Sequence, residues 1–365
     1  MIIDDIALTL QPKIGPHTAA HLLSCFGSAE KIYSATADEI IQQAELNAEL
    51  ARQITAKTCH RQAEEELKYC QLNGITPIAW DSGEYPRLLK EISDFPPVVY
   101  YKGDTKALSN RRTLAIVGTR RMTSYGQKVC ERIIAELAAL CPDIVIVSGL
   151  AYGVDGACHR AALAHGLSTV AVLPNPVTTI YPSQHTRLAE EMIAHGGGIL
   201  SEYHSRMKIK GVTFLARNRI IAGMSAGTLV IESPEKGGSM ITARLAHGYD
   251  RSVMAIPGRI GDTCSEGTNK LIATEMARMV CSGEDIAREL GWEHVRPTTS
   301  TILEQPTLSP EAGKLLSLIP ESDTISIDTL AALSNISIAE VSTLLFELEF
   351  EGAIRALPGK LYEKA

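Results

Sequence analysis

Between residues 113 and 281 the chain alternates short apolar, β-branched runs with longer segments of helical periodicity. The apolar runs lie at residues 113–117, 143–147, 168–173, 198–201, 227–231, 252–256 and 278–281. The helical segments lie at residues 126–140, 153–165, 183–195, 214–222, 240–248 and 268–274. Strands that alternate with helices at this spacing form βαβ units, and nearly continuous apolar strands are typical of a sheet covered on both faces. The pattern therefore predicts an α/β domain with a Rossmann-like, doubly wound, mostly parallel sheet, which we place at residues 76–295.

The first segment, residues 1–75, has helical patterns at 17–26, 28–33 and 62–72. Thr36 followed by Glu39 is typical of a further helix start, because both residues can cap the first turn. These features predict a helical domain of the SAM or helix-hairpin-helix type.

The last segment follows a stretch rich in Pro, Thr and Ser at residues 296–307, which has linker composition. Residues 308–365 then combine three helical patterns with two short apolar runs around Pro358 and Gly359. The helices are expected at 309–318, 327–334 and 338–352. Three helices followed by a hairpin predict a winged helix.

Composition limits the classes of function. The net charge of −7 excludes a uniformly basic nucleic-acid binder but not a local basic site. No run approaches the roughly 20 apolar residues of a membrane span, and the acidic start is unlike a signal peptide, so we expect a cytoplasmic protein without membrane contact. The eight cysteines form no C-x-x-C pair and no zinc-finger spacing with histidine. We therefore expect no disulfide, metal or cofactor.

Three glycine-containing loops follow predicted strands and precede predicted helices. They contain Gly118, Thr119 and Arg120 in the first, Gly149 in the second, and Gly238 and Ser239 in the third. Ligands of parallel sheets bind at the carboxyl ends of strands near helix N-termini, where backbone amides can bind phosphate. None of the loops has the G-x-G-x-x-G or P-loop spacing, and each taken singly fits a tight turn equally well. Three of them on one sheet favour a phosphate site.

A basic segment, residues 206–219, has five cationic and no acidic residues among its fourteen. Its candidate DNA-binding residues are Lys210, Phe214, Arg217, Asn218 and Arg219. An aromatic ring among cations suits a single strand with unstacked bases. The alternative is a solvated charged face with Phe214 in the core.

A series of motifs in this domain resembles the DprA (DNA processing A, or Smf) family. In order, it contains AIVGTR at 115–120, SGLAYGVD at 148–155, YP at 181–182, SEY at 201–203, FLARNRIIAG at 214–223, GSMITAR at 238–244, AIPG at 255–258 and GTNKLI at 267–272. The resemblance covers about residues 80–290, and the flanking segments look like that family's optional terminal domains.

The resemblance implies a non-enzymatic protein that binds and protects incoming single-stranded DNA, usually as a homodimer through the Rossmann-like domain. It also implies that the protein loads the RecA recombinase onto this DNA during natural transformation and recombination. Arg120 matches the family's phosphate-binding arginine, and Phe214, Arg217 and Arg219 match its DNA-contacting Phe-x-x-Arg-Asn-Arg run. Two residues depart from the pattern: Tyr152 often is Arg in the family, and Ser183 often is basic.

Three other interpretations stay open. The sheet also resembles phosphoribohydrolases of the LOG (lonely guy) type, but the 236–244 segment lacks their Pro and has no carboxylate before Asp250. A winged-helix regulator of transcription is the second, and it is disfavoured by acids on the third helix. These acids are Glu340, Glu347, Glu349 and Glu351. The third is auxiliary DNA binding by a helix-hairpin-helix near Lys13 and Gly15.

Overall fold

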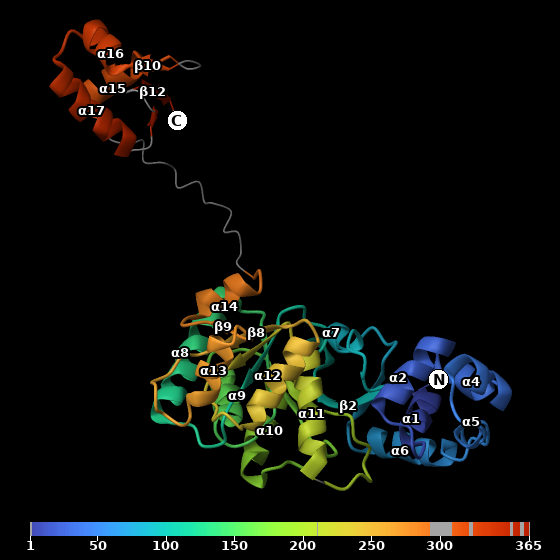
Figure 1. Ribbon diagram of the computed structural model, residues 1–365. Coiled ribbons are helices and arrows are strands. Elements are labelled where there is room, and N and C mark those ends of the chain that lie inside the picture. Colours follow the sequence, from blue (N-terminus) through green and yellow to red (C-terminus); the bar gives the residue numbers. More distant parts are fainter. Residues whose placement is uncertain are drawn as a thin grey trace. The chain divides into compact units, whose positions relative to one another are not determined.

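A computed structural model describes residues 2–209, 211–292, 309–320, 324–350, 353–357 and 361–364 of the chain (Figure 1). The chain divides by contacts into two compact units, Met1–Glu293 and His294–Ala365. Each unit is described by itself below. Lys210 and the predicted linker at 296–307 lie outside the described residues.

Nine strands of the described residues form one sheet in the first unit, in the order β1-β2-β6-β5-β4-β3-β7-β8-β9. The predicted strands are β3 (Thr113–Val117), β4 (Val145–Ser148), β5 (Thr169–Val172), β6 (Gly198–Ser201), β7 (Gly227–Val230), β8 (Ser252–Ala255) and β9 (Arg278–Met279). They are parallel to their neighbours among these seven, as the sequence predicted. Because the chain moves from β3 through β4, β5 and β6 and then returns to the other side of β3, the order reverses beside β3. Such a switch point is where sheets of this class bind ligands.

Two strands that the sequence analysis did not predict extend the sheet. β1 (Thr76–Ala79) pairs antiparallel with β2 (Val98–Gly103), and β2 pairs antiparallel with β6. Neither strand belongs to a βαβ unit, so the alternation that indicated the other seven strands could not indicate these two.

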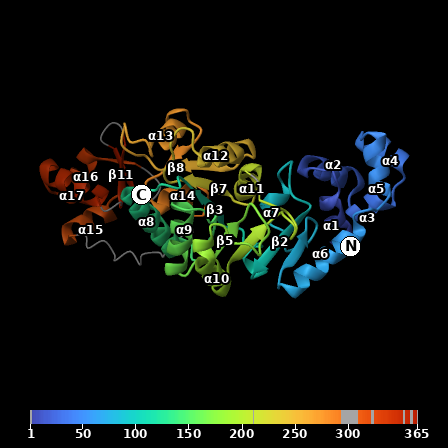
Figure 2. The same ribbon diagram turned by 90° about the horizontal axis from the view of Figure 1, so that it is seen from below.

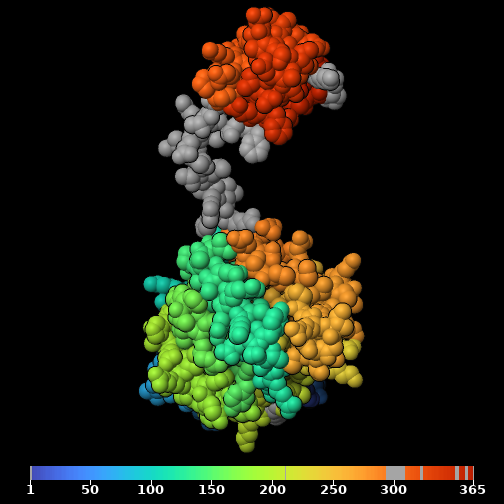
Figure 3. Space-filling model, turned by 90° about the vertical axis from the view of Figure 1, so that its left-hand side faces the viewer, coloured from blue at the N-terminus to red at the C-terminus, as the bar shows by residue number. Residues whose placement is uncertain are grey.

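Helices cover both faces of the sheet, and successive side chains of β3 point to opposite faces, as the pleat requires. Leu114 and Ile116 pack with α8 (Ser124–Leu140), α9 (Val154–Ala164) and α14 (Gly283–Glu289). Ala115 and Val117 pack with the helices of the other face. These are α7 (Arg87–Lys90), α11 (Gly211–Gly223), α12 (Gly238–Gly248) and α13 (Glu266–Ala273). Figure 2 shows the strands between α12 and α13 on one side and α9 and α10 (Thr186–Ala194) on the other, and Figure 3 shows the surface of α8 (green) beside the α13–α14 segment (orange).

Six helices precede β1: α1 (Ile2–Leu10), α2 (Pro16–Phe26), α3 (Ala29–Ser34), α4 (Ala37–Ala44), α5 (Ala48–Thr55) and α6 (His60–Leu72). The capping box of Thr36 and Glu39 forms at α4 as predicted, whereas α1 and α5 were not predicted. Apolar residues of these helices share one core with Val98, Tyr100 and Ala171 of the sheet. The helical segment thus packs directly on the β2 end of the sheet. The domain boundary at residue 75 stays a prediction.

The second unit is the predicted winged helix. It contains α15 (Pro310–Ser317), α16 (Ile327–Ser334) and α17 (Ile338–Phe350), with a sheet of β10 (Ile325–Ser326), β12 (Leu361–Lys364) and β11 (Ile354–Leu357) in that order. Apolar residues such as Leu330, Val341 and Leu345 form its core. In the described part of the chain no single helix is long and apolar enough to cross a membrane. One pair, Ile327–Ser334 with Ile338–Glu349, bent by 110°, passes that test only when both helices are combined.

The acids of α17 are only partly where the sequence analysis placed them. Glu340 and Glu349 are exposed. Glu347 is half-buried instead, because it accepts hydrogen bonds from the backbone N–H of Ser309 (2.8 Å) and from its hydroxyl (3.0 Å) at the start of α15. Glu351 lies outside the described residues.

Candidate nucleic-acid interface

The loop after β3 holds Arg120 at an exposed tip. A Cβ atom at Gly118 would collide with Val154 of α9, so only glycine lets the loop pass so close to that helix. The backbone N–H of Thr119 donates to the carbonyl of Glu232 (2.7 Å), and the Thr119 hydroxyl accepts from the N–H of Arg121 (3.1 Å). These contacts fix the backbone on both sides of Arg120 and leave its side chain to solvent.

The loop after β4 is closed by a buried arginine. The carbonyl of Gly149 accepts a hydrogen bond from Nη1 of Arg217 (2.7 Å), and a Cβ atom at Gly149 would collide with that guanidinium. The backbone N–H of Ala151 donates to the carboxylate of Asp155 (3.3 Å) in the first turn of α9. Burial raises the pKa of Asp155, and the Arg217 guanidinium opposes this rise. The buried Arg217 guanidinium thus acts on the buried Asp155 carboxyl through their opposite charges.

The loop after β7 leads into α12 through Gly237, Gly238 and Ser239. The Ser239 hydroxyl is buried and donates to the hydroxyl of Ser233 (2.8 Å). A Cβ atom at Gly238 would meet no neighbour within 4 Å, so space alone does not require glycine there. Because α12 begins at Gly238, the N-terminal turn of this helix lies at the same edge of the sheet as the other two loops.

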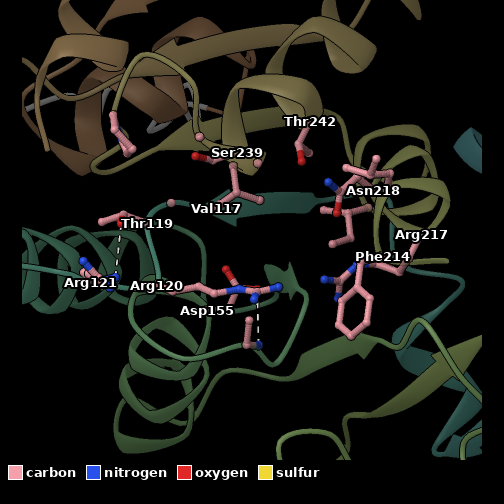
Figure 4. A pocket seen from close by; sticks show the side chains of 17 residues that line it. Val117, Thr119, Arg120, Arg121, Asp155, Phe214, Arg217, Asn218, Ser239 and Thr242 are labelled. Carbon is pink, nitrogen blue, oxygen red and sulfur yellow. Dashed lines mark hydrogen bonds between the residues drawn. The ribbon is translucent and has the colours of Figure 1, made fainter. Parts of the chain in front are cut away.

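The three loops and the N-terminal half of α11 enclose one cavity of about 430 Å³ at the switch point of the sheet (Figure 4). Eight predicted site residues line it: Gly118, Thr119, Arg120, Phe214, Arg217, Asn218, Gly238 and Ser239. Gly149 lies just behind the lining and holds Arg217. Residues that lie far apart in the sequence, from Gly118 to Ser239, are therefore brought to one site, as the sequence pattern predicted. Their contact with DNA stays a prediction.

Phe214 lies at the rim of this cavity among other rings and cations. Its ring meets that of Tyr181 edge-on, with 5.6 Å between the ring centroids and 73° between the planes. The guanidinium carbon of Arg120 lies 5.7 Å from the Phe214 ring centroid, and in Figure 4 the Arg120 side chain extends toward Phe214. Phe214 is half-buried, so part of it faces solvent beside the exposed arginine. An aromatic surface next to a free cation is the combination that single-stranded nucleic acid binds.

Arg219 is not brought to the cavity. Its guanidinium lies in a buried cluster, where Nη2 pairs with the carboxylate of Glu202 and Nη1 donates to the carbonyl of Asp94 (2.7 Å). The Tyr249 hydroxyl donates to Oδ1 of Asp94 (2.8 Å) and completes the cluster. Only 7% of the Arg219 side chain is exposed. The sequence analysis grouped Arg219 with the DNA contacts, whereas the structure joins it to two carboxylates from elsewhere in the fold.

The sequence analysis did not predict several residues at the site, of which three have side chains that bear on its chemistry. Thr242 lines the cavity one turn of α12 after Ser239, a spacing that could have indicated it. Asp155 is the one acid among the described lining residues, and Tyr181 contacts Phe214. Both lie in motifs quoted for the family resemblance, but nothing in the sequence showed that they meet α11.

Among the described residues no group of three or more His, Cys, Asp or Glu side chains could hold a metal ion. The cysteines are free thiols. The chemistry available at the cavity is therefore that of backbone amides, hydroxyls, arginines and one buried carboxylate.

Comparison with known proteins agrees with this geometry. Residues 76–291, more than half of the chain, match the model of the family described as DNA recombination-mediator protein A. The chain belongs to this family. Residues 301–360 match the model of the DprA winged helix domain. The family resemblance stated from the ordered motifs and the fold class of both units are thereby confirmed.

Relatives of known name extend the match over most of the chain. Protein Smf of Escherichia coli K12 is 34% identical over 317 residues, which cover 82% of this chain and 83% of that protein. DNA processing protein DprA of Bacillus subtilis is 40% identical over 225 residues, 62% of this chain and 74% of that protein.

Two solved structures share the fold. The DNA processing protein A of Streptococcus pneumoniae matches with a TM-score of 0.68 and 30% identity, covering 79% of this chain and 97% of that one. The protein from Helicobacter pylori matches with a TM-score of 0.53 and 32% identity, covering 60% and 97%, and its structure is described as giving insight into a single-stranded DNA binding mode.

Proposed function

We propose that this chain binds single-stranded DNA with its phosphates at the cavity between the three loops and α11. The observation that carries the proposal is the placement of exposed Arg120, 5.7 Å from the Phe214 ring, at an edge where the N-termini of α9 and α12 also point. Helix N-termini and a free guanidinium both favour phosphate, and the ring favours an unpaired base. The single-stranded DNA binding mode described for the Helicobacter pylori relative supports the same conclusion.

We further propose, from family membership, a finer role in recombination. The protein would protect incoming single-stranded DNA in the cytoplasm, load RecA recombinase onto it during natural transformation, and act as a homodimer through the Rossmann-like domain. The description of the family as a recombination mediator supports this role. Complex formation with purified RecA and a measured mass in solution would test it.

We also propose that the protein is not an enzyme. Hydrolysis of a glycosidic bond generally uses two placed carboxyl groups. Among the described residues of the cavity, Asp155 is the one acid, and it is buried beside the charge of Arg217. α12 carries none. Purified protein should therefore release no base from AMP and no phosphate from ATP. Steady turnover that is lost on mutation of Ser239 would contradict this.

The binding proposal is tested by comparing a single-stranded oligonucleotide with its duplex across a salt series. We expect tighter binding of the single strand at every salt concentration, little dependence on sequence, and weaker binding as salt rises. Equal or better binding of the duplex at moderate salt would overturn the proposal.

A further inference from the structure

Two exposed tyrosines follow neighbouring strands at the edge of the sheet that holds the cavity. Tyr152 comes after β4 and Tyr181 after β5, and β4 and β5 are paired. Their exposed fractions are 45% and 48%. Neither lines the cavity itself. Most aromatic side chains of so aromatic-poor a chain are expected in its cores, so two exposed rings on one edge require an explanation.

Both rings lie beside the short segment at residues 181–185 and are positioned by contacts with neighbouring side chains. Tyr181 begins that segment and meets the ring of Phe214 edge-on at 5.6 Å. The Tyr152 hydroxyl donates to Oε1 of Gln184 (2.7 Å), and its ring meets that of His185 edge-on, with 5.4 Å between the centroids. His185 is itself buried and bonded through Nδ1 to the carbonyl of Leu150 (2.8 Å). The Tyr152 ring is thus already ordered by its edge-on contact and its hydrogen bond, although nearly half of the residue is exposed. A base that stacks on it therefore costs little further side-chain entropy.

The charges nearby define the ligand. Arg120 is exposed and lies beside Phe214, which touches Tyr181. A strand whose phosphates sit at Arg120 and the cavity would carry its bases away from the loops. Tyr181 contacts Phe214, and Tyr152 contacts Gln184 and His185, which follow Tyr181 by three and four residues, so both rings lie beside the same short segment next to Phe214 and offer a surface for those bases. In a duplex the base faces are already stacked on each other and are not available.

We propose that Tyr152 and Tyr181 form a base-stacking subsite that continues the site from Phe214 along residues 181–185. Its ligand is the unpaired bases of the strand whose phosphates occupy the cavity. The inference rests on the proposed function, and it assigns to Tyr152 and Tyr181 a contact with bases and not with phosphates.

The test measures how the full-length protein binds two single-stranded oligonucleotides of equal length. One consists of deoxythymidines and the other of abasic deoxyribose phosphates. Tyr152→Ala and Tyr181→Ala should each lower affinity for the base-containing strand roughly fivefold or more, from a stacking energy of about 1–3 kcal/mol per base. They should leave affinity for the abasic strand and the salt slope unchanged, because no phosphate contact is lost. Tyr152→Phe and Tyr181→Phe should retain most of the affinity, because the ring stays.

Tyr125→Ala is the matched control. Tyr125 is 47% exposed, like the other two, but it lines a separate hollow with Arg259 and its hydroxyl donates to the carbonyl of Pro257 (2.9 Å). We expect it to bind both oligonucleotides as the parent does. A parent protein that does not prefer single strands over duplex would refute the proposed function. Suppose instead that the parent prefers single strands. The stacking subsite alone would then be refuted if the two alanine variants bind both oligonucleotides as tightly as the parent, or if they lose affinity for the abasic strand by the same factor as for the base-containing strand.

Discussion

The β3–α8 loop and helix α11 both carry arginines of the predicted DNA site, but they present them in opposite ways. Arg120 is exposed, and its guanidinium lies beside an aromatic ring. Arg217 and Arg219 are 5% and 6% exposed. Nη1 of Arg217 donates to the carbonyls of Gly149 and Val172, while its Nε is buried without a hydrogen-bond partner. Arg219 pairs with the carboxylates of Glu202 and Asp94. The Arg219 guanidinium, whose charge is offset by two carboxylates, has little left to offer a phosphate. Arg217 lines the cavity. Burial and existing partners therefore lead us to predict a DNA contact for Arg120 and a structural role for Arg219, although both were predicted as DNA contacts from the sequence.

The largest effect, on the stability of the fold, should come from replacing the buried Arg219. Arg219→Met removes the cation from a cluster in which Glu202 and Asp94 are also buried, with side-chain exposures of 10% and 12%. Breaking a buried pair by removing one partner costs about 3–5 kcal/mol. We expect urea denaturation to show a loss of that order in the free energy of unfolding. A second change, Glu202→Gln, should restore part of it, because a neutral side chain is less costly to bury.

The same variant separates a positioning role from a DNA contact. α11 carries Phe214 and Arg217, so loosening it should weaken binding of single-stranded DNA. The salt slope of that binding should stay as in the parent, because no phosphate contact is removed. A slope that flattens by one phosphate, with parental stability, would show that Arg219 binds DNA after all.

The second effect, on DNA affinity, should come from replacing the exposed Arg120. Arg120→Ala should cost about 1.5–3 kcal/mol of binding free energy, roughly a tenfold to hundredfold loss of affinity, through the loss of a charge-assisted phosphate contact. Arg120→Lys should recover only part, because lysine keeps the charge and loses the planar fork. Fluorescence anisotropy with single-stranded DNA across salt should show a flatter slope, while thermal unfolding barely changes.

Arg160→Ala is the control for charge alone, since Arg160 is exposed on α9 and does not line the cavity. It should bind DNA nearly as the parent does. If Arg120→Ala unfolds the protein, or if both variants lose affinity equally, the exposed arginine is not the phosphate contact.

A third, smaller effect tests whether burial or the Arg217 guanidinium has the larger influence on the pKa of Asp155. Burial raises the pKa of Asp155 and Arg217 opposes the rise. A carboxyl whose pKa is higher in the folded than in the unfolded chain favours folding when protonated, and that contribution is lost as pH rises through its folded pKa. Relative to Asp155→Asn, the parent should therefore lose stability as pH rises above about 4. Urea denaturation at several pH values measures this; a difference that is constant with pH, or that grows in favour of the parent, would mean that Arg217 outweighs burial.

The sequence predicted the part of the fold that has a repeating local pattern. β3 and β6 have the predicted bounds, and the three glycine loops meet at one cavity because parallel strands bring their carboxyl ends to one edge. The partners of Arg219 could not be predicted in this way. Glu202 and Asp94 lie 17 and 125 residues away in the chain, and the apolar residues of α11 do not gather on one face. Without a polar face to indicate exposure, a basic helix and a buried ion cluster have the same sequence pattern.

The smallest effect on DNA affinity should come from α17, the acidic helix of the winged-helix unit. This helix contains no Lys or Arg, in contrast to the loop of Arg120. α17 presents exposed Glu340 and Glu349, and acids of this kind repel phosphate. Glu340 accepts hydrogen bonds from the backbone N–H of Ser337 (3.0 Å) and from its hydroxyl (2.8 Å), so Glu340→Gln keeps a capping residue and removes only charge. If bound DNA does not approach α17, the double variant Glu340→Gln, Glu349→Gln of the full chain should change affinity for single-stranded DNA less than about twofold, because an exposed charge acts on a phosphate only within roughly 10 Å at 0.1 M salt. A tenfold gain, with a steeper salt slope, would instead place α17 beside the bound strand and make the winged helix part of the DNA site.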